Sequence, residues 1–535
     1  MKTMINSIIL ASCLALPLAS CSDSDAAPEQ KDWSTTTYFN SSDAAAQDTY
    51  YKPAVGYVGD PMPFFDPVAG DFKVLYLQDF RPNPEGTYHP IWGVSTKDAA
   101  HYTALGELVS CGTLKSQDAA IGTGSTIYDE ASKLYYTFYT GNKYKPTGDE
   151  SAQAVMVATS ADFKTWTKDR TFLLKGQDFG YDKNDFRDPF VFKGDDGKFH
   201  MLISTKKGGK GSLAEFVSDD LKNWTDNGVF MTMMWDRFYE CPDLFKMGDY
   251  WYLVYSEIHH AVRRVQYFKG RTLDELKACT ANDVARWPDA HEGFLDSRGL
   301  YAGKTASDGT NRYLWGWCPT RSGKDNTAVG ASPAEPEWAG NLVCYKLIQH
   351  EDGTLTLGQV DAVSEKYNQD VAVEVKESQN MTEADGTYTL AGNTKQPDAY
   401  MLMGRLGNHN KISFTVTTTD KWDKFGISMV RGSDSKKYYT MVVNPENENN
   451  RKVNFEEQGV EGKGFIAGID GYVFARPADN VYNVTIYTDN SICVMYINDV
   501  CSYTNRIYGI QKNCWSINSY NGANVKISNL KISQY

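Results

Sequence analysis

Three carboxylic acids in this sequence stand where strands are expected to begin. Asp60, Asp188 and Glu240 each precede an apolar run, within the tripeptides Gly-Asp-Pro, Arg-Asp-Pro and Glu-Cys-Pro. Clustered like charges raise one another's pKa, so a fold keeps them mainly for a cation, a metal or acid–base chemistry. A nucleophile, a proton donor and a group that stabilises a cationic transition state would together cleave a glycosidic bond. Calcium binding, which needs more oxygen ligands, and simple capping of backbone amides are the alternatives.

The segments around these residues recur along the first two-thirds of the chain. Each unit contains small or charged residues, an apolar strand, a polar turn and an aromatic-rich strand. The units begin at Gly59, Gly122, Phe186, Tyr239 and Arg298, and a second motif that follows three of them contains Ser95, Ser160 and Ser218. Five such units predict five four-stranded blades of a β-propeller, although a sandwich with long loops would produce similar strands.

A propeller would bring the three carboxylates together. The inner strand of every blade lines one central channel, so side chains at equivalent positions converge there. We place Asp60, Asp188 and Glu240 at equivalent positions in blades one, three and four. The prediction is that they meet at the mouth of the channel.

The chain of 535 residues is too long for one hydrophobic core, and its pattern is all-β throughout. The predicted segments are a lipoprotein signal peptide at 1–21, a flexible tether at 22–45, a five-bladed β-propeller at 46–358, a linker at 359–374 and a C-terminal β-sandwich at 375–535.

The N-terminal segment predicts export. Lys2 precedes the apolar run 8–18, and Leu-Ala-Ser-Cys ending at Cys21 resembles the lipobox of bacterial lipoproteins, in which the cysteine is lipidated. An ordinary signal peptide is the alternative. We therefore expect a lipid-anchored protein of the bacterial cell envelope, facing the periplasm or the cell surface, that contacts the membrane through its anchor only.

Composition excludes several classes of partner. The formal charge of −13 argues against nucleic acid and anionic membrane surfaces. No Cys-x-x-Cys pair is present, which argues against a zinc site. We predict no metal site and no cofactor. Cys493 and Cys501 are the closest pair of cysteines in the mature sequence, but disulfide pairing and oligomeric state are left open.

Several segments resemble glycoside hydrolase family 32, the family of invertases, inulinases and levanases. Arg187-Asp188-Pro189 and Glu240-Cys241-Pro242 are similar to its Arg-Asp-Pro and Glu-Cys motifs, and further similar segments follow in the family's order: 294–305, 311–317, 337–355 and 484–500. The resemblance implies a propeller followed by a sandwich, and an oligo- or polysaccharide substrate.

By resemblance, Asp60 is the nucleophile that attacks a β-fructofuranosyl unit. Glu240 is the acid/base, with a pKa held up by neighbouring negative charge, and Asp188 holds sugar hydroxyls. The family retains anomeric configuration, which implies that the Asp60 and Glu240 carboxyl groups lie roughly 5–5.5 Å apart.

The resemblance also suggests residues that bind substrate. Arg187 would donate to a hydroxyl or hold a carboxylate. Gln78, Asp296, Thr123 and Ser125 match polar family positions near the pocket, although Gln78 could equally be a satisfied strand residue and Asp296 a turn residue. Trp92 and Trp315 could stack on a sugar face, or equally serve as core tryptophans. The predicted substrate-binding residues are therefore Arg187, Gln78, Trp92, Thr123, Ser125, Asp296 and Trp315.

The nucleophile motif departs from the family. An asparagine usually precedes the Asp-Pro pair and another follows it, whereas here Gly59 and Met62 occupy those places. Two hydrogen-bonding groups close to the sugar are thereby absent.

Three functions remain open from the sequence. The first is a retaining, exo-acting enzyme that releases β-fructofuranosyl units from sucrose or from fructans such as inulin and levan. The second is an inverting furanosidase of the related five-bladed family 43, which needs a water between wider-spaced carboxylates. The third is a glycan-binding surface lipoprotein without turnover. Transfer of fructose to another sugar also stays open, because the same intermediate serves hydrolysis and transfer.

Overall fold

The computed structural model describes residues 49–80, 88–233, 238–257, 264–279, 293–297, 299–320, 338–431, 437–445, 453–456 and 476–535. The predicted signal peptide, Cys21 and the tether lie outside these ranges. Within the described ranges no helix is long and apolar enough to cross a membrane.

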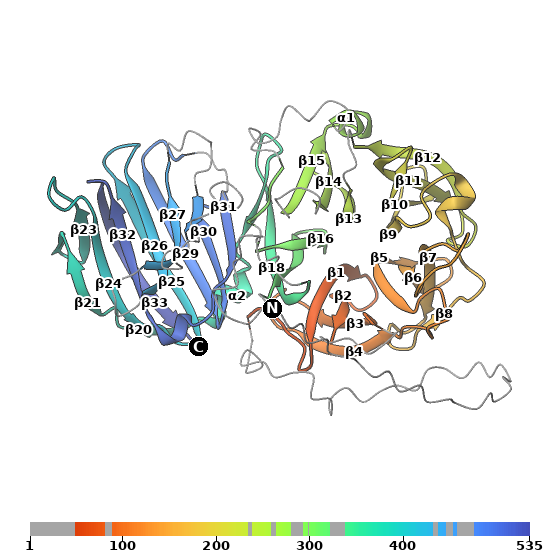
Figure 1. The fold of residues 1–535 in the computed structure, drawn as a ribbon, viewed down its shortest axis with the longest axis horizontal. Helices are drawn as coiled ribbons and strands as arrows, with labels where there is room; N and C mark the ends of the chain where they lie inside the picture. Colours follow the sequence, from red (N-terminus) through yellow and green to blue (C-terminus); the bar gives the residue numbers. More distant parts are fainter. Residues whose placement is uncertain are drawn as a thin grey trace, which may run out of the picture.

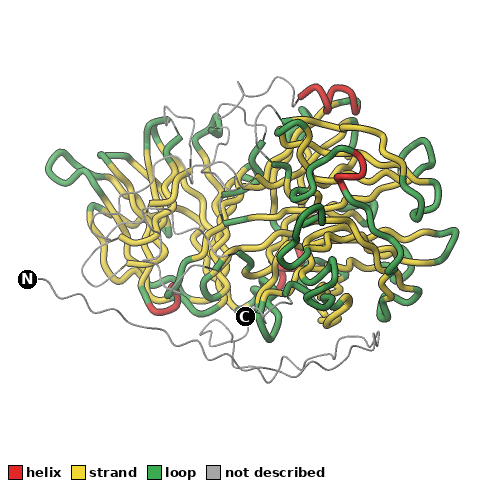
Figure 2. Tube along the Cα trace, turned by 45° about the vertical axis from the view of Figure 1, so that its right-hand side comes forward, coloured by secondary structure: helices red, strands yellow, loops and turns green. Residues whose placement is uncertain are grey.

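Small antiparallel sheets are arranged in a ring around a central axis in the first part of the chain, and a two-layered structure lies beside them (Figure 1). Strands dominate both parts, and the few helices are short and peripheral (Figure 2). The predicted all-β fold, a five-bladed propeller followed by a β-sandwich, is confirmed.

Each blade is built from consecutive strands, and its first strand lies innermost. The strands are, for blade one, β1 (Tyr57–Asp66), β2 (Asp71–Asp79), β3 (Ile91–Thr96) and β4 (Thr103–Val109); for blade two, β5 (Ala120–Asp129), β6 (Leu134–Asn142), β7 (Gln153–Ser160) and β8 (Thr167–Lys168); for blade three, β9 (Phe186–Lys193), β10 (Phe199–Lys207), β11 (Lys210–Ser218) and β12 (Thr225–Thr232); for blade four, β13 (Glu240–Met247), β14 (Tyr250–Glu257) and β15 (Arg264–Gly270); and for blade five, β16 (Tyr301–Ser307), β17 (Arg312–Pro319), β18 (Gly340–Gln349) and β19 (Leu355–Gly358).

The second repeated motif forms a turn after the third strand of blades one to three. The side-chain hydroxyls of Thr96, Ser160 and Ser218 bond to the aspartate two residues later, at 3.1–3.2 Å. The next residue adopts a positive φ and buries its side chain: Ala99, Phe163 and Leu221. Thr96, and not Ser95 as the sequence motif suggested, is therefore the equivalent residue in blade one.

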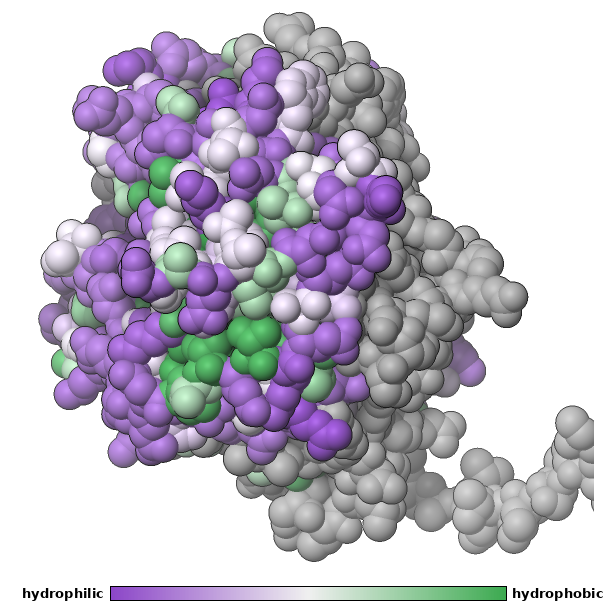
Figure 3. Space-filling view, turned by 90° about the vertical axis from the view of Figure 1, so that its left-hand side faces the viewer, coloured by the Kyte–Doolittle hydropathy of each residue, from purple (hydrophilic) through white to green (hydrophobic). Residues whose placement is uncertain are grey.

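The sandwich consists of two facing sheets (Figure 1). One contains β20 (Gln369–Val371), β22 (Met381–Ala384), β23 (Thr387–Ala391), β25 (His409–Thr418), β29 (Val481–Asp489), β30 (Ile492–Ile497), β31 (Cys501–Arg506) and β33 (Asn524–Gln534); the other contains β21 (Val375–Gln379), β24 (Ala399–Arg405), β26 (Lys424–Arg431), β27 (Lys437–Val443), β28 (Val453–Glu456) and β32 (Cys514–Tyr520). The face turned away from the propeller is mostly hydrophilic, with one compact hydrophobic patch (Figure 3).

One of the hydrophobic cores extends across both domains. Tyr345 of β18 packs near Tyr496 of β30, with ring centroids 6.4 Å apart, inside a cluster that also includes residues of blades one and four. The guanidinium group of Arg506 donates to the carbonyls of Pro319 and Cys318, at 3.0 and 2.9 Å. The predicted linker contains helix α2 (Asp361–Lys366) and strand β20, which pairs with β33. The joint is thus packed and continuous.

Candidate active site

All five inner strands contain a β-bulge at an equivalent position near the start of the strand. The register against the second strand shifts between Gly59 and Met62, Gly122 and Gly124, Arg187 and Phe190, Glu240 and Asp243, and Tyr301 and Lys304. A bulge leaves residues unpaired and turns side chains away from the regular alternation, and it is a position where a strand accepts proline. This explains the Asp-Pro, Asp-Pro and Cys-Pro pairs, because each proline occupies an unpaired position that needs no N–H donor.

The bulges arrange the channel side chains in three tiers. The first tier, before the bulge, contains Gly59, Gly122, Arg187, Glu240 and Tyr301; the second, within it, contains Asp60, Thr123, Asp188, Cys241 and Ala302; the third, after it, contains Met62, Gly124, Phe190, Asp243 and Lys304. Arg187 and Glu240 keep side-chain exposures of 17% each, whereas the side chains of Met62, Asp243 and Lys304 are almost fully buried. The first tier therefore faces the mouth and the third forms the floor.

The predicted equivalence of Glu240 with Asp60 and Asp188 is wrong by one residue. Glu240 is equivalent to Arg187, and Cys241 is equivalent to Asp188. The three carboxylates nevertheless lie near one another: the charges of Asp60 and Glu240 both contribute to the raised pKa of Asp188. The offset places Glu240 one level nearer the mouth, separate from the other two.

Asp188 is buried and incompletely paired. Its backbone has φ +58°, and its Oδ2 accepts the backbone N–H of Cys241 at 2.9 Å. Burial raises the pKa of Asp188 to about 7, the Arg187 charge opposes this rise, and the charges of Glu240 and Asp60 add to it. A buried carboxylate with spare lone pairs is suited to accept hydroxyl donors from a sugar.

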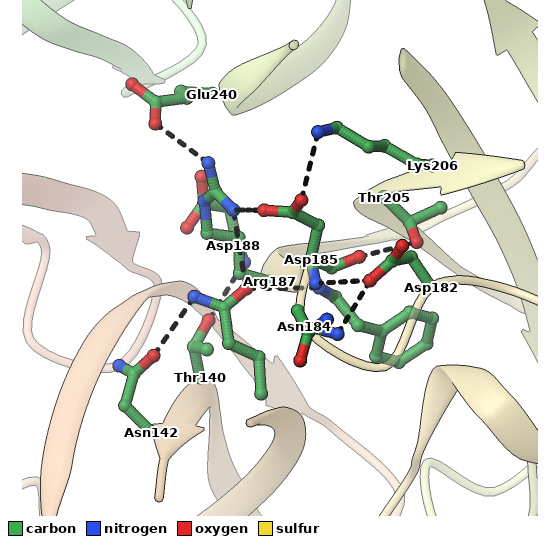
Figure 4. Close-up of polar contacts among 12 residues, drawn as sticks. Thr140, Asn142, Asp182, Asn184, Asp185, Arg187, Asp188, Thr205, Lys206 and Glu240 are labelled. Carbon is green, nitrogen blue, oxygen red and sulfur yellow. Dashed lines mark hydrogen bonds and ion pairs between the residues drawn. The ribbon is translucent and has the colours of Figure 1, made fainter. Parts of the chain in front are cut away.

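Arg187 and Tyr301 hold Glu240 from both sides. The Nη2 of Arg187 donates to Glu240 Oε1 at 3.0 Å, and the hydroxyl of Tyr301 donates to Oε2. Arg187 also donates to Asp185 at 2.7 Å (Figure 4), and its guanidinium lies 3.8 Å from the centroid of the Phe238 ring. Arg187 is thus a carboxylate holder, one of the two roles predicted for it.

Asp60 is oriented by a tryptophan. The Nε1 of Trp317 donates to Asp60 Oδ1 at 3.0 Å, from the strand next to Tyr301. Asp60 is partly exposed, whereas Trp317 is fully buried. One oxygen of Asp60 is therefore fixed by a rigid donor.

Packing explains the two departures in the nucleophile motif. A Cβ at Gly59 would lie 2.2 Å from the Trp338 ring, so no side chain fits there. The Trp338 ring also lies 4.2 Å from the His89 ring, centroid to centroid. Met62 is buried on the floor, where its sulfur accepts the N–H of Gly124 at 3.1 Å. The aromatic surface of Trp338 takes the place of an amide beside Asp60.

Of the remaining predicted binding residues, Thr123, Ser125 and Gln78 lie in blades one and two, on or next to the inner strands. Thr123 lies in the second tier, buried, and its hydroxyl has no partner among the described residues. Ser125 bridges blades two and three, donating to the carbonyl of Pro189 and accepting from the N–H of Val191. Gln78 is fully buried and donates to the carbonyl of Val55 at 2.6 Å.

Three predicted positions do not fit a binding role. Trp315 is fully buried and donates to the hydroxyl of Tyr102 at 3.1 Å, so it is a core residue. Trp92 is partly buried; it packs against the same core, and its ring lies 5.9 Å from that of Phe80, centroid to centroid. Asp296 is fully buried at the domain joint, where Thr504 and Ser502 donate to it. In each case the contacts of the side chain lie in a hydrophobic core or at the domain joint.

Sequence reasoning missed four residues of the channel: Tyr301, Lys304, Trp317 and Trp338. All four lie in segments used for the family resemblance, but their roles depend on which face of a strand each occupies. A lysine inside the apolar stretch Tyr-Ala-Gly-Lys-Thr was the one available signal. Among the described residues, no group of three or more His, Cys, Asp or Glu side chains could hold a metal ion, and none of the eight described cysteines forms a disulfide.

Two family models together match almost all of the described chain. Residues 50–360 match the family described as glycosyl hydrolases family 32 N-terminal domain, and residues 353–532 match the GH32, BT1760-like, C-terminal domain. A β-fructofuranosidase, insoluble isoenzyme, from Arabidopsis thaliana is 25% identical over 320 residues, covering 54% of this chain and 51% of the relative. A sucrose-6-phosphate hydrolase from Vibrio alginolyticus is 25% identical over 217 residues, covering 39% of this chain and 41% of the relative. The chain thus spans about half the length of these curated relatives or less.

Solved structures share the fold over almost the whole chain. An exo-inulinase from Aspergillus awamori superposes with TM-score 0.67 at 15% identity, covering 91% of this chain and 98% of the other. A sucrose-6-phosphate hydrolase from Lactobacillus gasseri gives TM-score 0.66 at 17% identity, covering 94% of each chain.

Proposed function

This chain belongs to glycoside hydrolase family 32, and from that premise we propose that it is a retaining β-fructofuranosidase that releases fructose from sucrose or a fructan. The observation that carries the proposal is the channel cluster. Two carboxylates with different partners, Asp60 in the second tier and Glu240 in the first, both act through their charges on the buried Asp188. This arrangement supplies separate groups for attack and for proton transfer.

Asp60 is the nucleophile in this proposal. With Oδ1 held by Trp317, its other oxygen attacks the anomeric carbon, and the bond from that carbon to the leaving oxygen breaks. The product of this step is a fructosyl ester of Asp60. In the second step a water oxygen bonds to the same carbon and the Asp60 carboxylate leaves, so two inversions retain the configuration.

Glu240 transfers the proton in both steps. Its carboxylic acid gives a proton to the leaving oxygen, and the resulting carboxylate then takes a proton from the attacking water. The contacts with Arg187 and Tyr301 keep the carboxyl group pointed into the channel. Its place one tier nearer the mouth suits a group that must reach the leaving oxygen.

Asp188 and Trp338 bind the sugar. The spare lone pairs of Asp188 accept ring hydroxyls, and these bonds strengthen as the sugar becomes cationic. The aromatic surface of Trp338 beside Gly59 gives the sugar an apolar face to pack on. A buried acceptor and an aromatic surface in one site are typical of a site for a small polar ring.

The test is the product formed from a panel of substrates. The protein is incubated with sucrose, inulin, levan and arabinan, and the anomeric form of the first product is followed by NMR. Fructose released with retained configuration supports the proposal. Inversion, release of arabinose alone, or binding without release contradicts it, and a fructosylated sugar product would indicate transfer.

We infer further that the protein is anchored in the bacterial cell envelope through Cys21. The support is the sequence alone: a short apolar run followed by Leu-Ala-Ser-Cys. Metabolic labelling with a radioactive fatty acid should mark the full chain and not Cys21→Ser. Equal labelling of both proteins would contradict the inference.

A further inference from the structure

A lysine that the mechanism above does not use lies on the floor of the channel. Lys304, on β16 of blade five, is 2% exposed. Its Nζ donates to the carbonyl of Gly124 at 2.6 Å and lies 5.5 Å from the centroid of the Phe190 ring. Burying an ammonium group is costly, so a fold retains one where negative charge opposes it.

The contacts of Lys304 cross the channel. Gly124 belongs to blade two and Phe190 to blade three, and neither blade is next to blade five in the ring. Blade one, which carries Asp60, lies between blades five and two. The lysine therefore reaches across the channel one tier below Asp60 and Asp188.

Negative groups face this ammonium from three blades. They are the carboxyl groups of Asp60 on β1, Asp188 on β9 and Asp243 on β13. The thiol of Cys241 on β13 also lies nearby, but burial raises its pKa well above the ordinary value and keeps it neutral. Glu240 acts on Asp188 in turn, and the nearby cations are Arg187 and Arg312. Arg187 is bound to Glu240 and Asp185, and Arg312 acts on Asp243. Burial lowers the pKa of Lys304, while the negative groups around it, Asp60 and Asp188 included, oppose that fall.

We propose that Lys304 is a positioning residue of the proposed reaction: its ammonium group, held on the channel floor by Gly124, keeps the Asp60 carboxylate ionised and in place. Asp60 must be ionised to attack, and it must regain its charge when the fructosyl ester is hydrolysed. A fixed cation one tier below favours the ionised form at both points. This inference rests on the proposed function, because it assigns Asp60 the nucleophilic role.

The first test compares pH profiles of kcat/KM. K304M removes the charge and keeps the chain length, K304R keeps the charge, and K346M removes a lysine from the outer part of the same blade. In K304M the acidic limb should move up by about one pH unit, which is a roughly tenfold loss of kcat/KM on that limb. K304R should stay closer to the wild type, and K346M should match it. A uniform loss across all pH values in K304M would overturn the proposal.

The second test does not need turnover and separates this inference from the proposed function. The stability change caused by D60N is measured in the wild-type and K304M backgrounds. An ionised Asp60 facing Lys304 predicts that D60N stabilises K304M more than it stabilises the wild type. Equal effects overturn the inference even if the enzyme is active. If K304M does not fold but K304M/D60N does, the pairing is supported; if neither folds, Lys304 serves packing and the proposal fails.

Discussion

Two buried aspartates in this protein have opposite surroundings. Burial raises the pKa of both Asp188 in the channel and Asp296 at the domain joint. Asp296 accepts four hydrogen bonds, from the backbone of Ser297 and Thr504 and the hydroxyls of Ser502 and Thr504. The described residues give the carboxylate of Asp188 one, from Cys241. The lone pairs of Asp296 are thus filled by the protein, whereas those of Asp188, which we propose to bind the sugar, are left for a ligand.

The largest expected effect separates the channel from the joint by activity. D60N and E240Q should each lower kcat by about a thousandfold or more, because each removes one of the two groups that we propose as nucleophile and proton donor. D296N should leave kcat within about threefold of the wild type, because Asp296 does not reach the channel. Initial rates of fructose release measure both. A large loss in D296N with an unchanged fold would break the comparison.

For the free energy of unfolding we expect the opposite: D296N should have the large effect and D60N the small one. D296N replaces an acceptor with an amide that cannot satisfy all four donors, and we expect a loss of about 2–4 kcal/mol. D60N should be neutral or stabilising, since it removes a charge from a cluster of like charges. Urea denaturation followed by tryptophan fluorescence checks this. A D296N protein as stable as the wild type would show that the joint does not depend on this carboxylate.

The pH dependence of D188N tests the charge of Asp188 directly. A folded pKa of about 7, above the ordinary 3.8, means that the protonated form is favoured in the fold. Stability from this group is full below pH 3.8 and is lost as pH rises towards 7. D188N should therefore match the wild type at about pH 4 and exceed it above pH 7 by about 2–4 kcal/mol.

Asp220 provides a control of opposite sign for that experiment. Backbone donors, Asn223 first, lower the pKa of Asp220 to about 2. Its contribution to stability is present above its ordinary pKa and is lost as pH falls towards 2. D220N should thus be less stable than the wild type at neutral pH. If D188N and D220N change stability in the same direction at pH 8, the assigned charge states are wrong.

The smallest predicted effect concerns the close contact between Gly59 and the Trp338 ring. G59A would push a methyl group into Trp338 and shift the strand that carries Asp60, so kcat/KM should fall about 10–100-fold. W338F in the same background should recover part of the loss. Gly404, whose Cβ would meet nothing closer than 3.6 Å, supplies the control G404A. Full activity of G59A would mean that Trp338 moves freely.

Local pattern was enough to predict the blades and the approximate site. The repeated hairpins follow from period-two alternation and turn residues, which neighbouring residues specify. The same alternation does not predict which side chain of a strand contacts Asp60. Trp315 and Trp317 are two residues apart, yet Trp315 packs against Tyr102 in the core and Trp317 donates to Asp60. The bulge in β16, invisible in the pattern, sets the register that decides this.

By itself the sequence determined that five similar hairpins would form, that acids would stand at the start of three of them, and which family the chain resembles. Only the tertiary structure decided which acids and cations share one channel tier, that Asp296 belongs to the domain joint, and that Lys304 lies one tier below Asp60. The physical reason is that charges interact through space. Asp296 meets Thr504 across 208 positions and Lys304 meets Gly124 across 180, separations at which local pattern carries no information.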